Sequence, residues 1–242
     1  MGTIKTGIPG LDEILSGGLV EGSTTLVSGR SGSGKSVFGL QFLYEGATQY
    51  DSPGILLTLE NRPNGIRKDA LQFGWDLKAL EDDGKIIIID AASSKAGLPT
   101  SERVALRRGF DMTTLAETIY KVVDESKAKR LVIDSLSGLT LRFSEPSEVR
   151  QELFRISALL NELEVTSLFI SEITDPRFQS RAGVEQFVVQ GLITLNLTEG
   201  DGGLQRDLLV WKMRQTSHSM KKHPFAIGKK GINISKTTRK KS

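Results

Sequence analysis

Short apolar runs alternate with helical patterns along the first two thirds of the chain. Runs rich in Val, Ile and Leu predict buried strands at residues 24–28, 55–59, 86–90, 131–134 and 167–171. Between these runs, apolar residues recur at helical spacing over residues 36–50, 64–73, 111–127 and 146–164. This alternation predicts an α/β fold with a largely parallel central sheet and flanking helices.

The pattern changes after residue 171. Shorter apolar segments at 192–197, 208–213, 225–227 and 232–234 are separated by turns rich in Gly and Asp. They predict antiparallel strands added to the edge of the sheet. Because no internal repeat or linker is evident, we expect one domain over residues 1–235 and a basic tail over 236–242.

Composition excludes several kinds of chemistry. The 242 residues include no Cys and two His, which removes disulfides, thiolate catalysis and Cys-ligated metals and leaves little for a His-based centre. A metal is therefore expected to be held by oxygen atoms.

The chain shows no secretory signal and no apolar run near the ~20 residues that span a bilayer, so we expect a cytoplasmic protein without a membrane span.

Positive charge is concentrated at the C-terminal end. Residues 1–207 hold 22 Lys and Arg against 29 Asp and Glu, whereas residues 208–242 hold 10 Lys and Arg and no acid. A basic segment of this kind is typical of contacts with nucleic acid, an anionic membrane surface or an acidic partner. It is equally typical of a solvated tail, and the sequence leaves these alternatives open.

One motif points directly to chemistry. Residues 29–36 match the pattern G-x-x-x-x-G-K-[ST], immediately after a predicted strand and before a predicted helix. In such a P-loop, glycines let backbone N–H groups turn toward a phosphate, Lys35 brings a charge to the β- and γ-phosphates, and the Ser36 hydroxyl binds Mg²⁺. The predicted phosphate-binding residues are Gly29, Arg30, Ser31, Gly32, Ser33, Gly34, Lys35 and Ser36.

A P-loop enzyme also needs carboxylates at the ends of other strands. Asp134 ends the predicted strand at 131–134 and is the expected partner of Ser36 at Mg²⁺. Asp90 has a similar local setting, and Asp134 is favoured over it because a hydroxyl residue and then a glycine follow Asp134. Glu60, after the strand at 55–59, is the candidate base that orients water. Either acid could instead be an ordinary turn or capping residue.

The remaining segments resemble a known family. The stretch 6–15 (TGIPGLDEIL) followed by Gly17-Gly18-Leu19 looks like the N-terminal signature of KaiC-type proteins, which are RecA-like ATPases. Further similar segments are 41–44 (QFLY), 73–77 (FGWDL), 109–111 (GFD), 152–155 (ELFR) and 212–218 (KMRQTSH). The resemblance covers nearly the whole chain and is strongest to uncharacterised single-domain archaeal KaiC-like proteins.

This resemblance implies a RecA-like P-loop NTPase core that binds ATP and Mg²⁺ as a ring, usually a hexamer, with nucleotide between neighbouring subunits. Lys212 and Arg214 match positions that reach the γ-phosphate of the adjacent subunit, where they stabilise transition-state charge. Thr216 and His218 match residues that touch the nucleotide across the same interface. The alternative for this segment is that its charges only cover the edge of the sheet.

Two departures from the family pattern limit what it implies. KaiC-type proteins carry two Glu residues after the second strand, whereas this chain reads Glu60-Asn61, which predicts slow hydrolysis with Glu60 as the base. The chain also lacks the duplicated domain and the phosphorylated Ser-Thr pair of the clock proteins. A circadian role is therefore not implied by the resemblance.

Three functions are compatible with these observations. The first is a slow, ring-forming ATPase with a regulatory or signalling role and an unknown protein partner. The second is a RecA/RadA-like DNA-binding ATPase with loops 144–147 and 174–186 at a pore; nucleic acid is not favoured, because those loops offer only Phe178 and the nearby Phe187 for stacking. The third is a nonhydrolysing scaffold that ATP assembles.

Overall fold

The computed structural model describes residues 2–107, 109–140, 143–175, 177–200 and 202–234. The predicted basic tail at 236–242 lies outside the described residues. Within the described part of the chain, no helix is long and apolar enough to cross a membrane.

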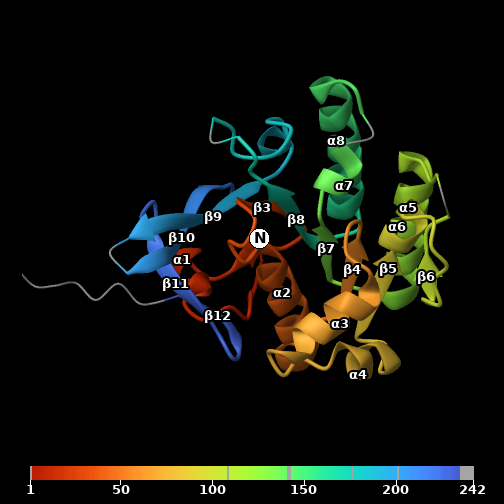
Figure 1. The fold of residues 1–242 in the computed structure, drawn as a ribbon, viewed down its shortest axis with the longest axis horizontal. Helices are drawn as coiled ribbons and strands as arrows, with labels where there is room; N and C mark the ends of the chain where they lie inside the picture. The colour runs from red at the N-terminus through yellow and green to blue at the C-terminus, as the bar shows by residue number, and fades with distance from the viewer. Residues whose placement is uncertain (1, 108, 141–142, 176, 201, 235–242) are drawn as a thin grey trace, which may run out of the picture.

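A ten-stranded sheet forms the centre of the molecule (Figure 1). Its strands lie in the order β12-β11-β10-β9-β3-β8-β7-β4-β5-β6. Their bounds are β3 (Thr24–Gly29), β4 (Gly54–Thr58), β5 (Ile86–Asp90), β6 (Val104–Ala105), β7 (Arg130–Asp134), β8 (Thr166–Glu172), β9 (Gly191–Gly200), β10 (Gly203–Met213), β11 (His223–Gly228) and β12 (Gly231–Ile234). A separate pair joins β1 (Thr3–Ile4) to β2 (Leu19–Val20).

The strands from β9 to β6 in this order run parallel, and β10, β11 and β12 continue the sheet in antiparallel pairs. This arrangement confirms the predicted α/β fold with C-terminal antiparallel strands. It differs in one respect, because β9 is antiparallel to β10 but parallel to β3. The segment between β8 and β9 is long enough to cross β3 and return in the same direction, which a tight hairpin could not do.

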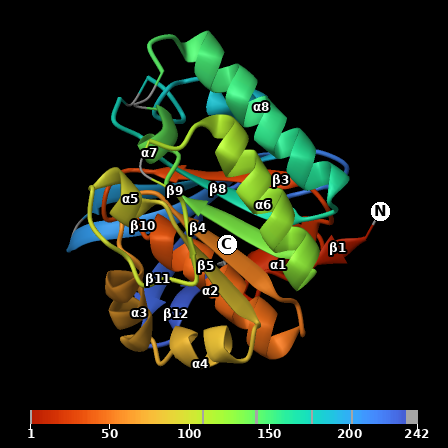
Figure 2. The ribbon, with the colours of Figure 1, turned by 90° about the vertical axis from the view of Figure 1, so that its right-hand side faces the viewer.

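Helices cover both faces of the sheet, as Figure 2 shows. On one face lie α2 (Lys35–Gln49), α3 (Pro63–Leu71) and α4 (Leu77–Asp82). On the other lie α6 (Met112–Ser126) and α8 (Pro146–Glu162). Each face has its own apolar core: Phe38 and Phe42 of α2 are fully buried in one, and Leu115 of α6 is fully buried in the other.

The ends of the predicted helices are set by local chemistry. α6 begins after Asp111, whose side chain accepts a hydrogen bond from the Thr114 N–H. α8 begins with Pro146 and a reciprocal capping arrangement between Glu145 and Glu148. Four short helices, α1 (Leu11–Ile14), α5 (Ala92–Lys95), α7 (Ser137–Thr140) and the 3₁₀ helix η1 (Glu185–Phe187), were not predicted from periodicity because each is about one turn long.

Candidate nucleotide site

The carboxyl ends of three parallel strands bring the candidate residues together. The P-loop follows β3, Glu60 lies two residues after β4, and Asp134 ends β7. Register places Thr58 of β4 opposite Asp134, and the Leu59 N–H donates to the Asp134 carbonyl (2.8 Å). Lys35, Glu60 and Asp134 are 25 to 99 positions apart in sequence, and they lie at one edge because parallel strands end on the same side.

Backbone conformation at the P-loop requires glycine at two positions. Gly32 has φ +78° and Gly34 has φ +106°, a region that residues with a β-carbon rarely adopt. A β-carbon at Gly34 would also lie 2.7 Å from the Cδ1 atom of Ile227 on β11. The loop leads directly into α2, so its N–H groups lie at the N-terminus of a four-turn helix, where the helix dipole favours an anion.

Contacts inside the loop involve Arg30. The Lys35 ammonium donates to the Arg30 carbonyl oxygen (2.9 Å), and the Ser33 N–H donates to the same oxygen (3.2 Å). The side chain of Lys35 thus lies over the loop that precedes it rather than extending away from it. This places a cation at the position where the P-loop pattern predicts one.

Ser36 and Asp134 form a side-chain pair. The Ser36 hydroxyl and the Asp134 carboxylate line the same cavity and interact there. Burial raises the pKa of Asp134; the Ser36 hydrogen bond and the Lys35 charge oppose this, whereas the nearby Glu60 carboxylate raises the pKa further. A buried carboxylate beside a hydroxyl is a suitable oxygen pair for a hard divalent cation, whose charge would favour the ionised form.

Three carboxylates surround the Lys35 ammonium. Burial lowers the pKa of Lys35, and the charges of Glu172, Asp134 and Glu60 oppose that lowering. Glu172 ends β8, opposite Gly29 of β3, and its carboxylate lies 3.5 Å from the Arg181 guanidinium. Sequence reasoning missed Glu172, although it had the same signal as Glu60: a carboxylate directly after an apolar strand.

Glu60 is held by a neighbour that was also not predicted. The Ser135 hydroxyl donates to Glu60 Oε2 (2.8 Å), so the side chain is fixed beside Asp134. Asn61, which follows it, accepts a hydrogen bond at its backbone oxygen from the Thr58 hydroxyl (2.5 Å). The sequence therefore leaves a single carboxylate, Glu60, at this turn.

The described residues suit Mg²⁺ rather than a metal held by the protein alone. No cluster of three or more His, Cys, Asp or Glu side chains with metal-ligand geometry occurs among them. Mg²⁺ is usually held by one or two protein oxygens together with phosphate oxygens and water. Ser36 and Asp134 place two such oxygens at the end of the P-loop.

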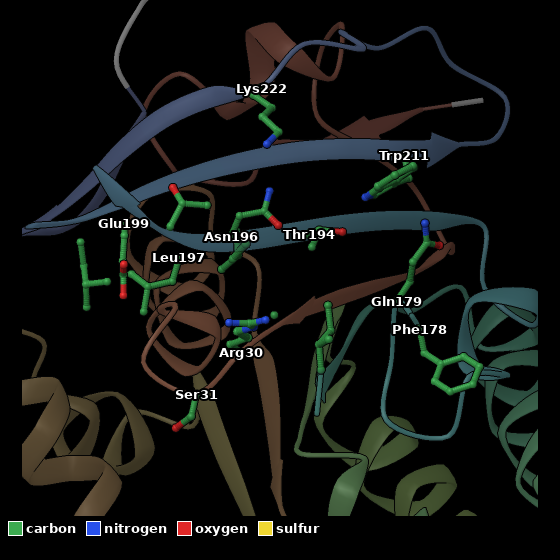
Figure 3. A pocket seen from close by; sticks show the side chains of 15 residues that line it. Arg30, Ser31, Phe178, Gln179, Thr194, Asn196, Leu197, Glu199, Trp211 and Lys222 are labelled. Carbon is green, nitrogen blue, oxygen red and sulfur yellow. The ribbon is translucent and has the colours of Figure 1, made fainter. Parts of the chain in front are cut away.

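Two cavities flank the P-loop. The larger, about 610 Å³, lies on the β9 and β10 side; Figure 3 shows Arg30 and Ser31 on one wall, with Thr194 and Asn196 of β9 across from them. The smaller, about 300 Å³, lies between α2 and α3 and is reached by Ser36 and Asp134. Its remaining wall is mostly apolar: Val37, Leu40, Leu56, Ile66 and Phe73, with Asn61, Asp69 and Gln72.

Lys212 and Arg214 lie at the opposite end of the sheet from the P-loop of the same chain. Met213 pairs with Gly191, and Gly191 pairs with Thr25 near the start of β3, whereas the P-loop follows the end of that strand. The offset from Thr25 to Gly29 is about 13 Å at a rise of about 3.3 Å per residue. Within one chain, the structure does not bring these residues to the P-loop.

The environments of the two cations differ. The Lys212 ammonium donates to the backbone oxygens of Gln186 (2.8 Å) and Val189 (2.7 Å), and the Arg214 side chain is exposed. Burial lowers the pKa of Lys212, and the positive charge of Arg214 lowers it further. An exposed Arg beside a partly desolvated Lys is an arrangement that can meet an anion brought by another molecule.

Thr216 and His218 follow in a segment that packs on α1. The Thr216 hydroxyl donates to the Leu15 oxygen (3.5 Å), and the His218 Nδ1 lies 3.3 Å from the Ser219 oxygen. The Ser219 N–H in turn donates to the Ile14 oxygen (2.9 Å). Both predicted residues therefore lie in the segment after β10 that also carries Arg214 and that contacts the end of α1.

Comparisons with known proteins agree with this architecture. Residues 4–239 match the family model described as "ATPase: KaiC". The chain is 43% identical over 236 residues to UPF0273 protein MJ1359 of Methanocaldococcus jannaschii, covering 97% of this chain and 96% of that one. The crystal structure of the KaiC-like protein PH0186 from Pyrococcus horikoshii OT3 superposes with a TM-score of 0.84 at 40% identity, covering 97% and 99% of the two chains.

Clock proteins are also similar over part of their length. The chain is 41% identical over 232 residues to the circadian clock oscillator protein KaiC of Parathermosynechococcus lividus. That alignment covers 95% of this chain but 42% of the clock protein. The chain thus spans less than half of the clock relative that it matches.

Proposed function

The chain belongs to the KaiC family of ATPases, and from that membership together with the geometry at the carboxyl edge of the sheet we propose that it binds Mg-ATP and hydrolyses it slowly. We further propose that it works as a ring of identical subunits, a hexamer, whose nucleotide state controls the binding of a protein partner. A clock function is not part of the proposal, because the shared region is less than half of the clock relative.

One observation carries the proposal: Lys35, Ser36, Glu60 and Asp134 converge from three strands onto one loop. Lys35 is the cation at the phosphate loop and interacts electrostatically with three carboxylates. In the proposed role it leaves the Arg30 oxygen and binds the β- and γ-phosphates. The loop N–H groups at the start of α2 bind the same phosphates.

Ser36 and Asp134 would hold Mg²⁺ through their paired oxygens. When bound, the ion neutralises charge that develops on the phosphate oxygens. The apolar cavity beside Ser36, lined by Val37, Leu40 and Phe73, is the proposed place for the nucleoside.

Glu60 is the proposed base. The Ser135 hydroxyl fixes its carboxylate through Oε2, which leaves Oε1 to accept a proton from an attacking water. With Asn61 beside it, no second carboxylate is present at this turn to share that task. We therefore expect turnover to be slow.

Arg214 and Lys212 are proposed to act in trans, together with Thr216 and His218. They lie at the far end of the sheet from their own P-loop, so a second copy is needed to bring them to a nucleotide. A guanidinium supplied in this way stabilises charge in the transition state. The same geometry gives a reason for assembly, since one subunit alone would lack these groups.

The test is ATP turnover by purified wild type beside Glu60→Gln and Lys35→Ala, with the oligomer mass recorded with and without Mg-ATP. We expect slow turnover by wild type, retained ATP binding but at least about 100-fold slower turnover for Glu60→Gln, and loss of binding for Lys35→Ala.

If wild type shows no turnover while ATP still drives assembly, the protein is an ATP-dependent scaffold and Glu60 has no catalytic role. Adding single-stranded DNA to the same assay separates a third outcome. A large stimulation would favour a DNA-dependent motor over the proposed ring ATPase.

A further inference from the structure

Strand β10 contacts the P-loop of its own chain through Arg206. This residue lies opposite Leu197 of β9 and on the same face of the strand as Leu208 and Val210, which are buried in the core on the α2 side. Its Nη2 atom donates to the backbone oxygen of Gly32 (3.1 Å). The two residues are 174 positions apart, so the sheet rather than local sequence brings them together.

The bonded peptide unit is a central one in the loop. Gly32 supplies its oxygen and Ser33 its N–H, and a planar trans peptide directs these two groups to opposite sides. Arg206 donates to the oxygen of this peptide unit, and the Ser33 N–H on its opposite side donates to the Arg30 oxygen (3.2 Å). Gly32 has φ +78°, and no heavy atom lies within 4 Å of where its β-carbon would be, so this face of the loop is open.

Hydrogen bonding around this peptide is incomplete. Among the described residues, the Arg206 Nε and the Ser33 Oγ are buried without a hydrogen-bond partner. Leaving such a donor unsatisfied costs about 1–3 kcal/mol, so an acceptor that reaches it is favoured. Both atoms lie next to the loop that the proposed function assigns to phosphate.

We propose that Arg206 is a positioning residue of the phosphate loop: its bond to the Gly32 oxygen fixes the peptide unit that carries the Ser33 N–H, and its Nε–H gains an acceptor when the loop is filled. This inference rests on the proposed nucleotide site. It assigns to β10 a contact with the nucleotide loop of its own chain, in addition to the residues that β10 carries at its other end.

The experiment is a titration of a fluorescent ADP analogue with Mg²⁺ against wild type, Arg206→Gln and Arg206→Lys. Lys121→Gln is the matched control, because it removes one positive charge from an exposed position on α6. We expect Arg206→Gln to weaken binding about tenfold through loss of a charge-assisted hydrogen bond, and to change kcat at saturating ATP by less than about threefold. Arg206→Lys should recover part of the affinity, since an ammonium can also donate to the Gly32 oxygen, and Lys121→Gln should bind like wild type.

A second readout separates positioning from a structural role. The thermal midpoint of each variant is measured without nucleotide and with Mg-ADP. A positioning role predicts a smaller nucleotide-induced rise for Arg206→Gln than for wild type, whereas a structural role predicts a lower midpoint without nucleotide and an unchanged rise. The unchanged rise, or wild-type affinity in Arg206→Gln, overturns the inference. Failure of wild type to bind the analogue overturns the proposed function and this inference with it.

Discussion

The two ends of the central sheet differ in how they are built. At the carboxyl end, β3, β4, β7 and β8 of one chain supply the loop, the cation and the carboxylates. These side chains interact electrostatically with one another within the chain. At the other end, Lys212 lies near the end of β10 and Arg214 directly follows the strand, at the opposite end of the sheet from the P-loop of the same chain. In the proposed function, the first end binds nucleotide within one chain, whereas the second acts on the nucleotide of a neighbouring subunit.

A single chain can therefore hold its functional side chains in place in two ways. Residues at the carboxyl end are held by a parallel sheet, whose strand ends meet for reasons of topology alone. Lys212 of β10 and Thr216 after it are held by side-chain hydrogen bonds to backbone oxygens of Gln186 in η1 and of Leu15 after α1, which set their direction but not their ligand. Substitutions at the two ends should therefore differ in whether a second subunit can compensate for them.

The largest expected effect comes from Arg214→Ala. If Arg214 acts on the nucleotide of a neighbour, its loss should lower ATP turnover about 10³-fold while leaving nucleotide binding intact, because the guanidinium stabilises charge mainly in the transition state. Steady-state turnover and analogue binding, measured on the same preparation, check this.

Mixing two inactive variants tests whether Arg214 acts on the nucleotide of a neighbouring subunit. Arg214→Ala keeps an intact P-loop and Lys35→Ala keeps an intact Arg214, so a co-assembled mixture should regain turnover at the interfaces that combine the two intact halves. Neither variant alone should do so. Absence of recovery in a mixture that is shown by mass to co-assemble would mean that Arg214 acts within its own chain or not at all.

The sequence predicted the carboxyl end better than the rest of the molecule. The five buried strands and the P-loop were found because both leave short, local signals: a run of Val, Ile and Leu, and glycines at fixed spacing. Glu172 carried the same signal as Glu60, a carboxylate after an apolar strand, and was missed because no motif includes it. The distances among these residues were not predictable, since strand order depends on long-range pairing.

Residues at and near β10 show the limit of local patterns. The Arg206 contact with Gly32 spans 174 positions and has no periodicity or motif to indicate it. The parallel pairing of β9 with β3 was likewise hidden, because an apolar strand looks the same whichever direction its neighbour runs. The roles of Lys212 and Arg214 were inferred from family resemblance, and they stay predictions until a second subunit is tested.

A smaller effect should follow from Gly34→Ala at the carboxyl end. The φ of +106° and the contact with Ile227 should cost about 1–3 kcal/mol of unfolding free energy, as is usual for a strained backbone. Urea denaturation measures this cost. Gly65→Ala on α3 is the control, because that position is open and helical, and the change should be neutral or stabilise by about 0.5–1 kcal/mol. Equal stability of the two variants would show that the loop relaxes around a β-carbon.

The smallest expected effect is on the pH profile of turnover. Burial and the Arg214 charge lower the pKa of Lys212, so its ammonium is present below that pKa and is lost as the pH rises through it, earlier than for an exposed Lys. If this charge acts on a neighbour's nucleotide, turnover should decline on the alkaline side. Lys212→Arg should move the decline to higher pH, since a guanidinium stays protonated there.

Lys222→Arg makes the same change at an exposed position and should leave the profile unaltered. Burial also lowers the pKa of Lys35, so a decline that is unchanged in Lys212→Arg would assign the titration to the carboxyl end of the sheet instead.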